Sequence, residues 1–147
     1  MDSGPGFPEP AREILRTLAQ KAHENGMDAV LDAAIKRMFP EPFIASNPEI
    51  INRRRQKLSE ANQYLFSNAA LALTVLDNSS NLSKIKKPTL VIVGLEDQAT
   101  PPELSFQLAQ GIKGAQLIEL PGIGHCPQLQ NPNAFLKAVK PFLGLIN

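Results

Sequence analysis

One short apolar run constrains the fold of this chain more than any other feature. Residues 89–93 read Thr-Leu-Val-Ile-Val, follow Pro88 and end at Gly94. A continuous, β-branched run of this length is typical of a strand that is buried on both faces of a parallel sheet. A second strand is predicted at residues 116–120, and helical patterns follow each strand. Residues 86–147 therefore predict a strand–helix–strand–helix unit of the α/β class with parallel strands.

Local signals mark where the two helices of this unit begin. Thr100 and Glu103 fit a capping box, with two prolines in the first turn, and Gly111 is placed to end that helix. Asn131 followed by Pro132 predicts an N-cap and first turn for the last helix.

The preceding part of the chain has a helical period instead. Residues 1–10 hold three prolines and two glycines and predict an irregular leading segment. Apolar stripes at three- and four-residue spacing then predict four helices. The first ends at Gly26, the second is stopped by the prolines at positions 40 and 42, the third begins at Asn47-Pro48, and the fourth covers residues 64–76.

Composition narrows the function classes. A length of 147 residues favours one domain, and a net charge of +1 argues against nucleic acid as the main partner. No apolar run is long enough for a membrane span, and the first residues lack the pattern of a signal peptide. A single cysteine fits a reducing compartment, so we expect a cytoplasmic protein.

Chemistry-bearing residues follow both predicted strands. Asp97 lies in the loop after the first strand, and His125 lies in the Pro-Gly-Ile-Gly-His-Cys-Pro loop after the second. The carboxyl ends of neighbouring parallel strands meet at one edge of a sheet, where ligands bind. A carboxylate on one imidazole nitrogen fixes the tautomer and leaves the other nitrogen as a general base.

These motifs resemble the C-terminal end of the α/β-hydrolase fold. Residues 94–97 match Gly-x-x-Asp, with a proline at position 101, and residues 121–125 match Pro-Gly-x-Gly-His. Residues 11–85 resemble the helical cap of the family, and residues 86–147 its C-terminal lobe. The 3-oxoadipate enol-lactonase-like hydrolases are the subgroup that the chain resembles. The resemblance thus implies an incomplete α/β-hydrolase fold, a helical cap followed by a parallel unit.

The resemblance also implies an activity. It assigns the acid of a Ser-Asp-His triad to Asp97 and the histidine to His125, with a small ester or lactone as substrate and no cofactor or metal. The family often has Glu five residues after the histidine, whereas this chain has Gln130. No serine stands in a Gly-x-Ser-x-Gly elbow. Ser3 is nearest to that pattern, but Met1 occupies the place of the first glycine. The nucleophile-bearing half is therefore expected to lie outside this chain.

Several residues have an alternative interpretation. Glu96 is the rival acid, one residue before Asp97. Cys126 follows the histidine, but as a sequence neighbour it is poorly placed for proton transfer, which favours a packing role. The basic run at residues 53–55, with Lys57, cannot form one helical stripe and predicts a solvated face. Core packing in the cap is favoured for three apolar residues, Met27, Met38 and Phe39.

Three functions remain open at this level. The first is an ester or lactone hydrolase whose serine comes from elsewhere, so that this chain alone is inactive. The second is a non-catalytic remnant that binds or assembles. The third is a dehalogenase or a carbon–carbon bond hydrolase on the same scaffold. Because two strands are too few for an independent sheet, we expect a homo-oligomer or association with a complementary N-terminal lobe.

Overall fold

Two strands, β1 (Leu90–Gly94) and β2 (Gln116–Leu120), form a parallel sheet, as the sequence predicts. The computed structural model of the protein describes residues 3–145. Its register pairs Leu90 with Gln116 and Gly94 with Leu120. β1 is buried at every position except its first. This burial confirms the interpretation of the apolar run as a strand with both faces covered.

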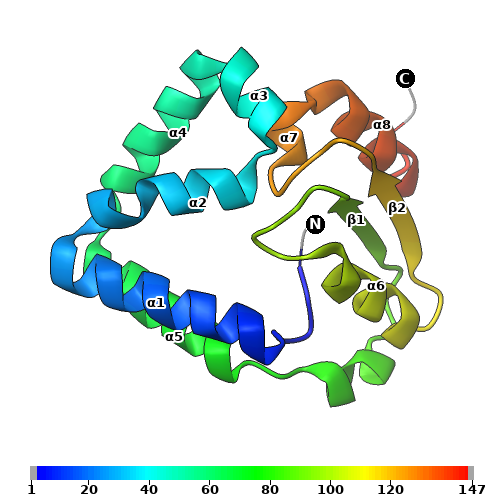
Figure 1. Ribbon diagram of the computed structural model, residues 1–147. Coiled ribbons are helices and arrows are strands. Elements are labelled where there is room, and N and C mark those ends of the chain that lie inside the picture. Colours follow the sequence, from blue (N-terminus) through cyan, green and yellow to red (C-terminus); the bar gives the residue numbers. More distant parts are fainter. Residues whose placement is uncertain (1–2, 146–147) are drawn as a thin grey trace.

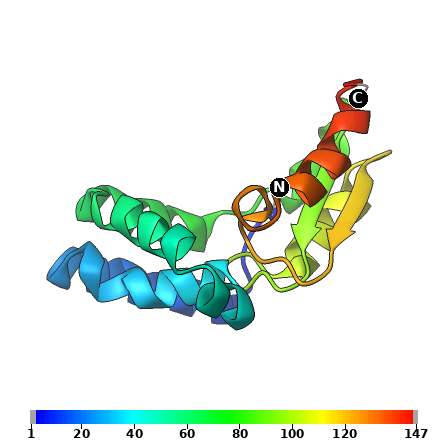
Figure 2. The same ribbon diagram turned by 90° about the horizontal axis from the view of Figure 1, so that it is seen from above.

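A different helix packs on each face of the sheet (Figure 2). On one face, Ile92 and Ile118 pack against Phe135 and Ala138 of α8 (Pro132–Phe142). The opposite face, which carries Leu117, lies beside α6 (Pro102–Gly111). The short helix α7 (Pro127–Gln130) connects the loop after β2 to α8. The order β1–α6–β2–α7–α8 is the predicted parallel unit with one additional helical turn.

Helices make up the preceding half, which lies to the side of the sheet unit (Figure 1). In chain order they are α1 (Glu9–Asn25), the 3₁₀ turn η1 (Met27–Val30), α2 (Leu31–Met38), α3 (Glu41–Ser46), α4 (Pro48–Ser59), α5 (Gln63–Val75) and the 3₁₀ turn η2 (Ser79–Lys84). α1 and α5 lie side by side along most of their length. No helix among residues 3–145 is long and apolar enough to cross a membrane.

Helix boundaries agree with the sequence signals in part. Gly26 ends α1 with a positive φ of 82°, which glycine adopts without steric cost. Asn131 caps α8, because its side chain accepts a hydrogen bond from the backbone N–H of Ala134. Asn47 precedes α4 as predicted, but its side-chain amide donates to the carbonyl of Phe43 instead of capping the helix.

The predicted capping box at Thr100 is wrong. α6 begins at Pro102, and its N-cap position is Pro101, which makes no side-chain cap. The backbone N–H of Thr100 donates instead to Asp97 Oδ1, at 2.9 Å. Thr100 is therefore part of the turn that holds Asp97.

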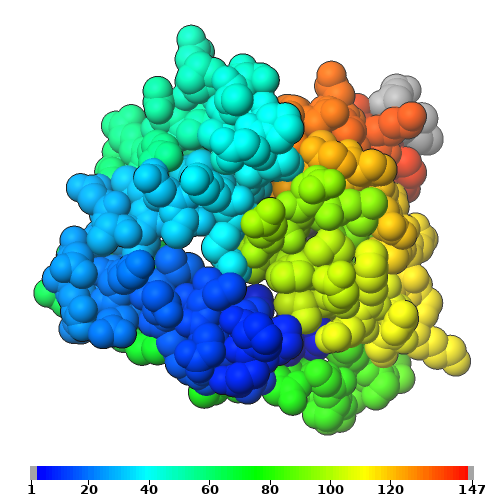
Figure 3. Space-filling model, viewed as in Figure 1, coloured from blue at the N-terminus to red at the C-terminus, as the bar shows by residue number. Residues whose placement is uncertain are grey.

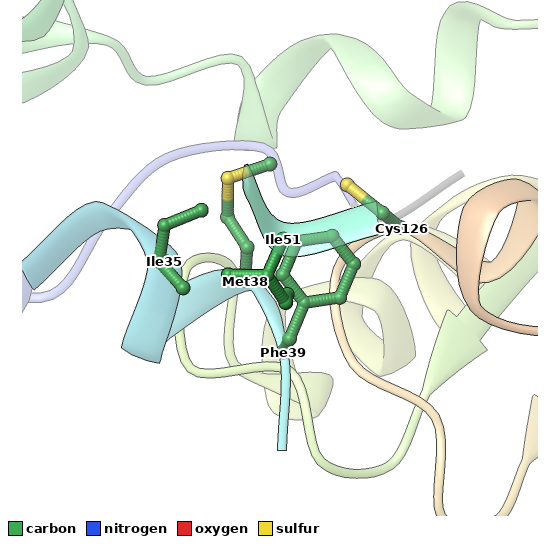
Figure 4. Close-up of a cluster of buried hydrophobic side chains, with 5 residues drawn as sticks. All are labelled: Ile35, Met38, Phe39, Ile51 and Cys126. Carbon is green, nitrogen blue, oxygen red and sulfur yellow. The ribbon is translucent and has the colours of Figure 1, made fainter. Parts of the chain in front are cut away.

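The predicted core residues of the helical half are buried. Met27 packs with Leu18 and Val30. Figure 4 shows the second cluster, in which the side chains of α2, α4 and the loop after β2 point toward one another. Its members are Ile35, Met38, Phe39, Ile51 and Cys126. The core interpretation of the two methionines, Phe39 and Cys126 is confirmed, and this cluster joins the helical half to the sheet unit.

The leading segment runs past both parts of the molecule. Gly6 forms an isolated antiparallel bridge with Asp77, and the carbonyl of Pro5 accepts from the backbone N–H of Asn78 at 2.7 Å. Ser105 Oγ of α6 donates to the carbonyl of Ser3. The predicted irregular segment becomes helical at Glu9, while Met1 and Asp2 lie outside the described residues, as do residues 146–147 of the predicted lobe.

Candidate active site

The loops after β1 and β2 lie against each other. The backbone N–H of Leu95 donates to the carbonyl of Leu120 at 3.1 Å, and that of Glu96 donates to the carbonyl of Ile123 at 2.9 Å. A Cβ atom on Gly94 would overlap with the carbonyl oxygens of Ile123 and Gly124. Only glycine permits this close approach, which brings the two predicted site residues to one edge of the sheet.

Asp97 and His125 form a direct side-chain pair. Asp97 Oδ2 lies 2.9 Å from His125 Nδ1, within the range of a hydrogen bond. The Asp97 side chain is fully buried, and that of His125 is 29% exposed. The predicted geometry is therefore present, 28 positions apart in sequence. Nδ1 is held by the carboxylate, which leaves Nε2 as the ring nitrogen available to a reacting group.

Backbone donors hold the second oxygen of the Asp97 carboxylate. Asp97 Oδ1 accepts from the backbone N–H of Ala99 at 2.7 Å and from that of Thr100 at 2.9 Å. Each carboxylate oxygen thus has a fixed role, one for the loop and one for the imidazole. Glu96, the rival acid, is exposed to solvent and is not the residue that pairs with His125.

Gln130 holds the turn that carries His125. Its Oε1 accepts from the backbone N–H of Gly124 at 2.8 Å, and its Nε2 donates to the carbonyl of Gly122 at 2.7 Å. The neutral amide serves one donor and one acceptor at once, whereas an ionised Glu could only accept. Gln130, which stands where the family often has Glu, therefore gives the turn a second hydrogen bond.

The end of α2 contacts both loops, which the sequence did not reveal. The carbonyl of Met38 accepts from the backbone N–H of His125 at 2.8 Å, and the carbonyl of Arg37 accepts from that of Gln98 at 3.2 Å. A Cβ atom on Gly124 would lie 2.5 Å from the Met38 oxygen. Figure 3 shows the light-blue atoms of this part of the helical half against the yellow-green atoms of the loop after β1.

Arg37 adds a charged side chain to this contact. Its Nη2 donates to the carbonyl of Ala99 at 3.1 Å. Burial lowers the pKa of Arg37, and the nearby negative charge of Asp97 acts in the opposite direction. The guanidinium is thus a half-buried positive charge near the carboxylate that pairs with His125.

Other candidates for chemistry lie elsewhere. The second histidine, His23, makes an edge-on ring contact with Tyr64 in the helical half. Within residues 3–145, no group of three or more His, Cys, Asp or Glu side chains is placed to hold a metal ion.

Known proteins match this arrangement. A family described as "TAP-like protein" matches residues 73–144. The crystal structure of the enol-lactonase from Burkholderia xenovorans matches with a TM-score of 0.90 and 29% identity, over 97% of this chain and 54% of that one. The chain has an incomplete α/β-hydrolase fold. The resemblance and the predicted fold class are therefore confirmed.

Curated hydrolases are also similar to this chain in sequence. 3-Oxoadipate enol-lactonase 2 of Acinetobacter baylyi is 28% identical over 129 residues, which cover 88% of this chain and 48% of the relative. The 2-hydroxymuconate semialdehyde hydrolase of Pseudomonas putida is 36% identical over 66 residues, 45% of this chain and 24% of that relative. Among solved structures, a thermophilic esterase from Thermogutta terrifontis matches with a TM-score of 0.82 and 27% identity, over 97% of this chain and 53% of that one. The chain spans about half the length of the enol-lactonases it matches.

Proposed function

We propose that Asp97 and His125 form the acid–base part of a Ser-His-Asp triad in a hydrolase of carboxylic esters or lactones. A polypeptide segment outside this sequence contributes the serine. The observation that carries the proposal is the 2.9 Å contact between Asp97 Oδ2 and His125 Nδ1, at the carboxyl ends of two parallel strands of an α/β-hydrolase fold. Similarity to enol-lactonases and to an esterase supports an ester or lactone substrate.

The geometry of the Asp97–His125 pair suits each proton transfer that the acylation and deacylation of a serine require. His125 Nε2 takes the proton of the serine hydroxyl as its oxygen attacks the carbonyl carbon, and gives that proton to the departing alkoxide. The same nitrogen then removes a proton from the water that cleaves the acyl-enzyme. Asp97 Oδ2 accepts the Nδ1–H bond throughout and stabilises the imidazolium that forms.

One observation favours a second candidate on the same scaffold. Two relatives with 36% identity are a 2-hydroxymuconate semialdehyde hydrolase and a hydrolase named for 2-hydroxy-6-oxononadienedioate. The second candidate is therefore hydrolysis of a 2-hydroxy-6-oxo acid with the same Asp97–His125 pair. A substrate of each class in the same assay separates the two candidates.

The partner that supplies the serine is proposed to bind at β1. Within residues 3–145, β1 pairs with a strand on one edge only, although its side chains are buried on both faces. An open edge beside an apolar surface favours pairing with another chain. In sedimentation velocity, we expect the chain to associate with itself or to form a complex with the segment that supplies the serine. A monodisperse species near 16.0 kDa would contradict this part of the proposal.

Ester hydrolysis tests the function. The chain is assayed with p-nitrophenyl esters, alone and after co-expression with the part of the Burkholderia xenovorans enol-lactonase that it does not match. Alone, it should be no faster than its His125→Ala variant. In the complex we expect a saturable rate, which His125→Ala lowers by about 10²–10⁴-fold.

Matched variants make the result specific. Asp97→Asn should lower the rate of the complex, whereas the neighbouring Glu96→Gln should not, because Glu96 is exposed. A rate in the isolated chain that His125→Ala abolishes would reveal a nucleophile within this sequence, and Cys126→Ser would then test the adjacent thiol. A stable complex without any His125-dependent rate would support the non-catalytic binding module.

A further inference from the structure

A separate pocket lies where α4 meets the segment that follows His125. Its volume is about 360 Å³. Helix α4 contributes Ile50, Arg53, Arg54 and Lys57 to the lining, and the segment around α7 contributes Gln128, Leu129 and Pro132. Neither Asp97 nor His125 lines it, so the pocket is distinct from the candidate active site.

The basic run of α4 is divided between two faces of the helix. Ile50, Arg53, Arg54 and Lys57 are spaced at i, i+3, i+4 and i+7, so they share one face, which is the face that lines the pocket. Arg55 leaves this stripe and forms an ion pair with Asp32. The predicted solvated face is confirmed for Arg53 and Lys57, which are exposed, whereas Arg54 and Arg55 are half-buried.

Two buried polar atoms of the pocket residues lack a hydrogen-bond partner among the described residues. They are Arg54 Nε and Gln128 Oε1. Both residues line the pocket, and rotation of the Gln128 amide would put its NH₂ group in the place of the unpaired oxygen, since the two orientations of an amide have nearly the same shape. A ligand that accepts hydrogen bonds from both would satisfy groups that the protein leaves unpaired.

The positive charge of the pocket is not neutralised internally. Lys57 pairs with Glu60 at 2.7 Å. No carboxylate within residues 3–145 forms an ion pair with Arg53 or Arg54. Arg54 Nη2 donates to the sulfur of Met38, at 3.9 Å, which does not neutralise its charge. Two guanidinium groups beside an apolar wall therefore favour an anion with an apolar part.

We propose that this pocket binds a small organic carboxylate with a short aliphatic chain. The carboxylate accepts hydrogen bonds from Arg54 and Gln128, with Arg53 adding charge, and Arg is the side chain best shaped for a carboxylate. The aliphatic chain lies against Ile50, Leu129 and Pro132. These apolar side chains exclude a purely inorganic anion as the best ligand, because it would leave them in contact with water.

Hexanoate is the probe, titrated into the ¹⁵N-labelled 147-residue chain and followed by two-dimensional NMR. We expect saturable shifts of the Arg54 Nε–H and Gln128 side-chain signals. Arg54→Gln should weaken binding by about tenfold or more, the typical value of a charged hydrogen bond. Arg55→Gln is the matched control, because it removes the same charge from the same helix outside the pocket, and should change affinity less than about twofold.

Other results of this titration would contradict the proposal. Equal losses in Arg54→Gln and Arg55→Gln would show diffuse charge attraction and overturn it. Equal binding of hexanol would remove the role of the carboxylate, and equal binding of inorganic phosphate would remove that of the apolar wall. If Arg54→Gln fails to fold, the exposed Arg53→Gln replaces it, and an unchanged affinity there overturns the proposal.

Discussion

The α1–α5 pair and the β1–β2 pair differ in how their backbone N–H and C=O groups find hydrogen-bond partners. Each helix completes its hydrogen bonds internally and packs through side chains such as Leu18 and Ala22. Each strand needs a neighbour, and β1 has one on a single edge within the described residues. Substitutions in the helical pair should therefore act through side-chain packing, whereas those in the sheet unit act through close backbone contacts.

The candidate active site depends on both kinds of contact. Its two side chains come from the loops of the sheet unit, but Met38 of α2 binds the backbone of His125, and Arg37 binds that of Gln98. The helical half thus supplies no member of the pair and yet is hydrogen-bonded to the backbone of both loops. Four substitutions test this division of roles, and the one with the largest expected effect comes first.

Gly94→Ala should have the largest effect. The new methyl group would meet the carbonyl oxygens of Ile123 and Gly124, which are backbone atoms and cannot rotate away. We expect a loss of about 3 kcal/mol in the free energy of unfolding, measured by urea titration. Gly114→Ala is the control, since nothing lies within 4 Å of its Cβ position and its φ of 79° alone should cost about 1 kcal/mol. Equal losses would refute the role of close backbone approach.

Gln130→Leu should come next. It leaves the buried N–H of Gly124 and the carbonyl of Gly122 without their side-chain partner, at a cost of about 2 kcal/mol in the free energy of unfolding. Gln130→Glu keeps the acceptor for Gly124 and should cost about half as much. The exposed Gln110→Leu in α6 serves as control and should be nearly neutral.

The arrangement of the pair was predictable because it depends on short-range signals. The apolar run before Gly94 locates one strand, residues 116–120 locate the other, and parallel pairing then brings Asp97 and His125 together. The catalytic role itself stays a proposal. The pair could be identified because both residues directly follow predicted strands. The sequence pattern locates these strands without any knowledge of side-chain contacts.

The contribution of α2 could not be predicted, because its contacts join distant positions. Arg37 and Ala99 are 62 residues apart, and no periodicity marks such a contact. Helix α3 was missed for a different reason. Pro40 and Pro42 predict a stop, yet Pro42 lies in the first turn of α3, where a missing N–H costs nothing.

Arg37→Gln tests whether the helical half fixes the Asp97 loop. Removing the hydrogen bond to Ala99 should cost about 1 kcal/mol in the free energy of unfolding. It should also speed amide hydrogen exchange at Ala99 and Thr100, whose N–H groups bind Asp97 Oδ1. Lys36→Gln, on the exposed side of α2, should leave both measurements unchanged. Unchanged exchange in Arg37→Gln would place the loop under the control of the sheet unit alone.

Glu9→Gln should have the smallest effect and the clearest dependence on pH. A hydrogen bond from Arg16 lowers the pKa of Glu9 below its usual 4.5, so the folded state favours the carboxylate. The contribution to stability is therefore present above that usual value and is lost as the pH falls through the lower, folded one. Both side chains are exposed and screened by salt, so thermal melts at pH 7 should barely separate the variant from the parent chain. The two should coincide at pH values below the folded pKa. A large difference at pH 7 that high salt removes would mean that surface charge, as well as side-chain packing, holds α1 in the helical half.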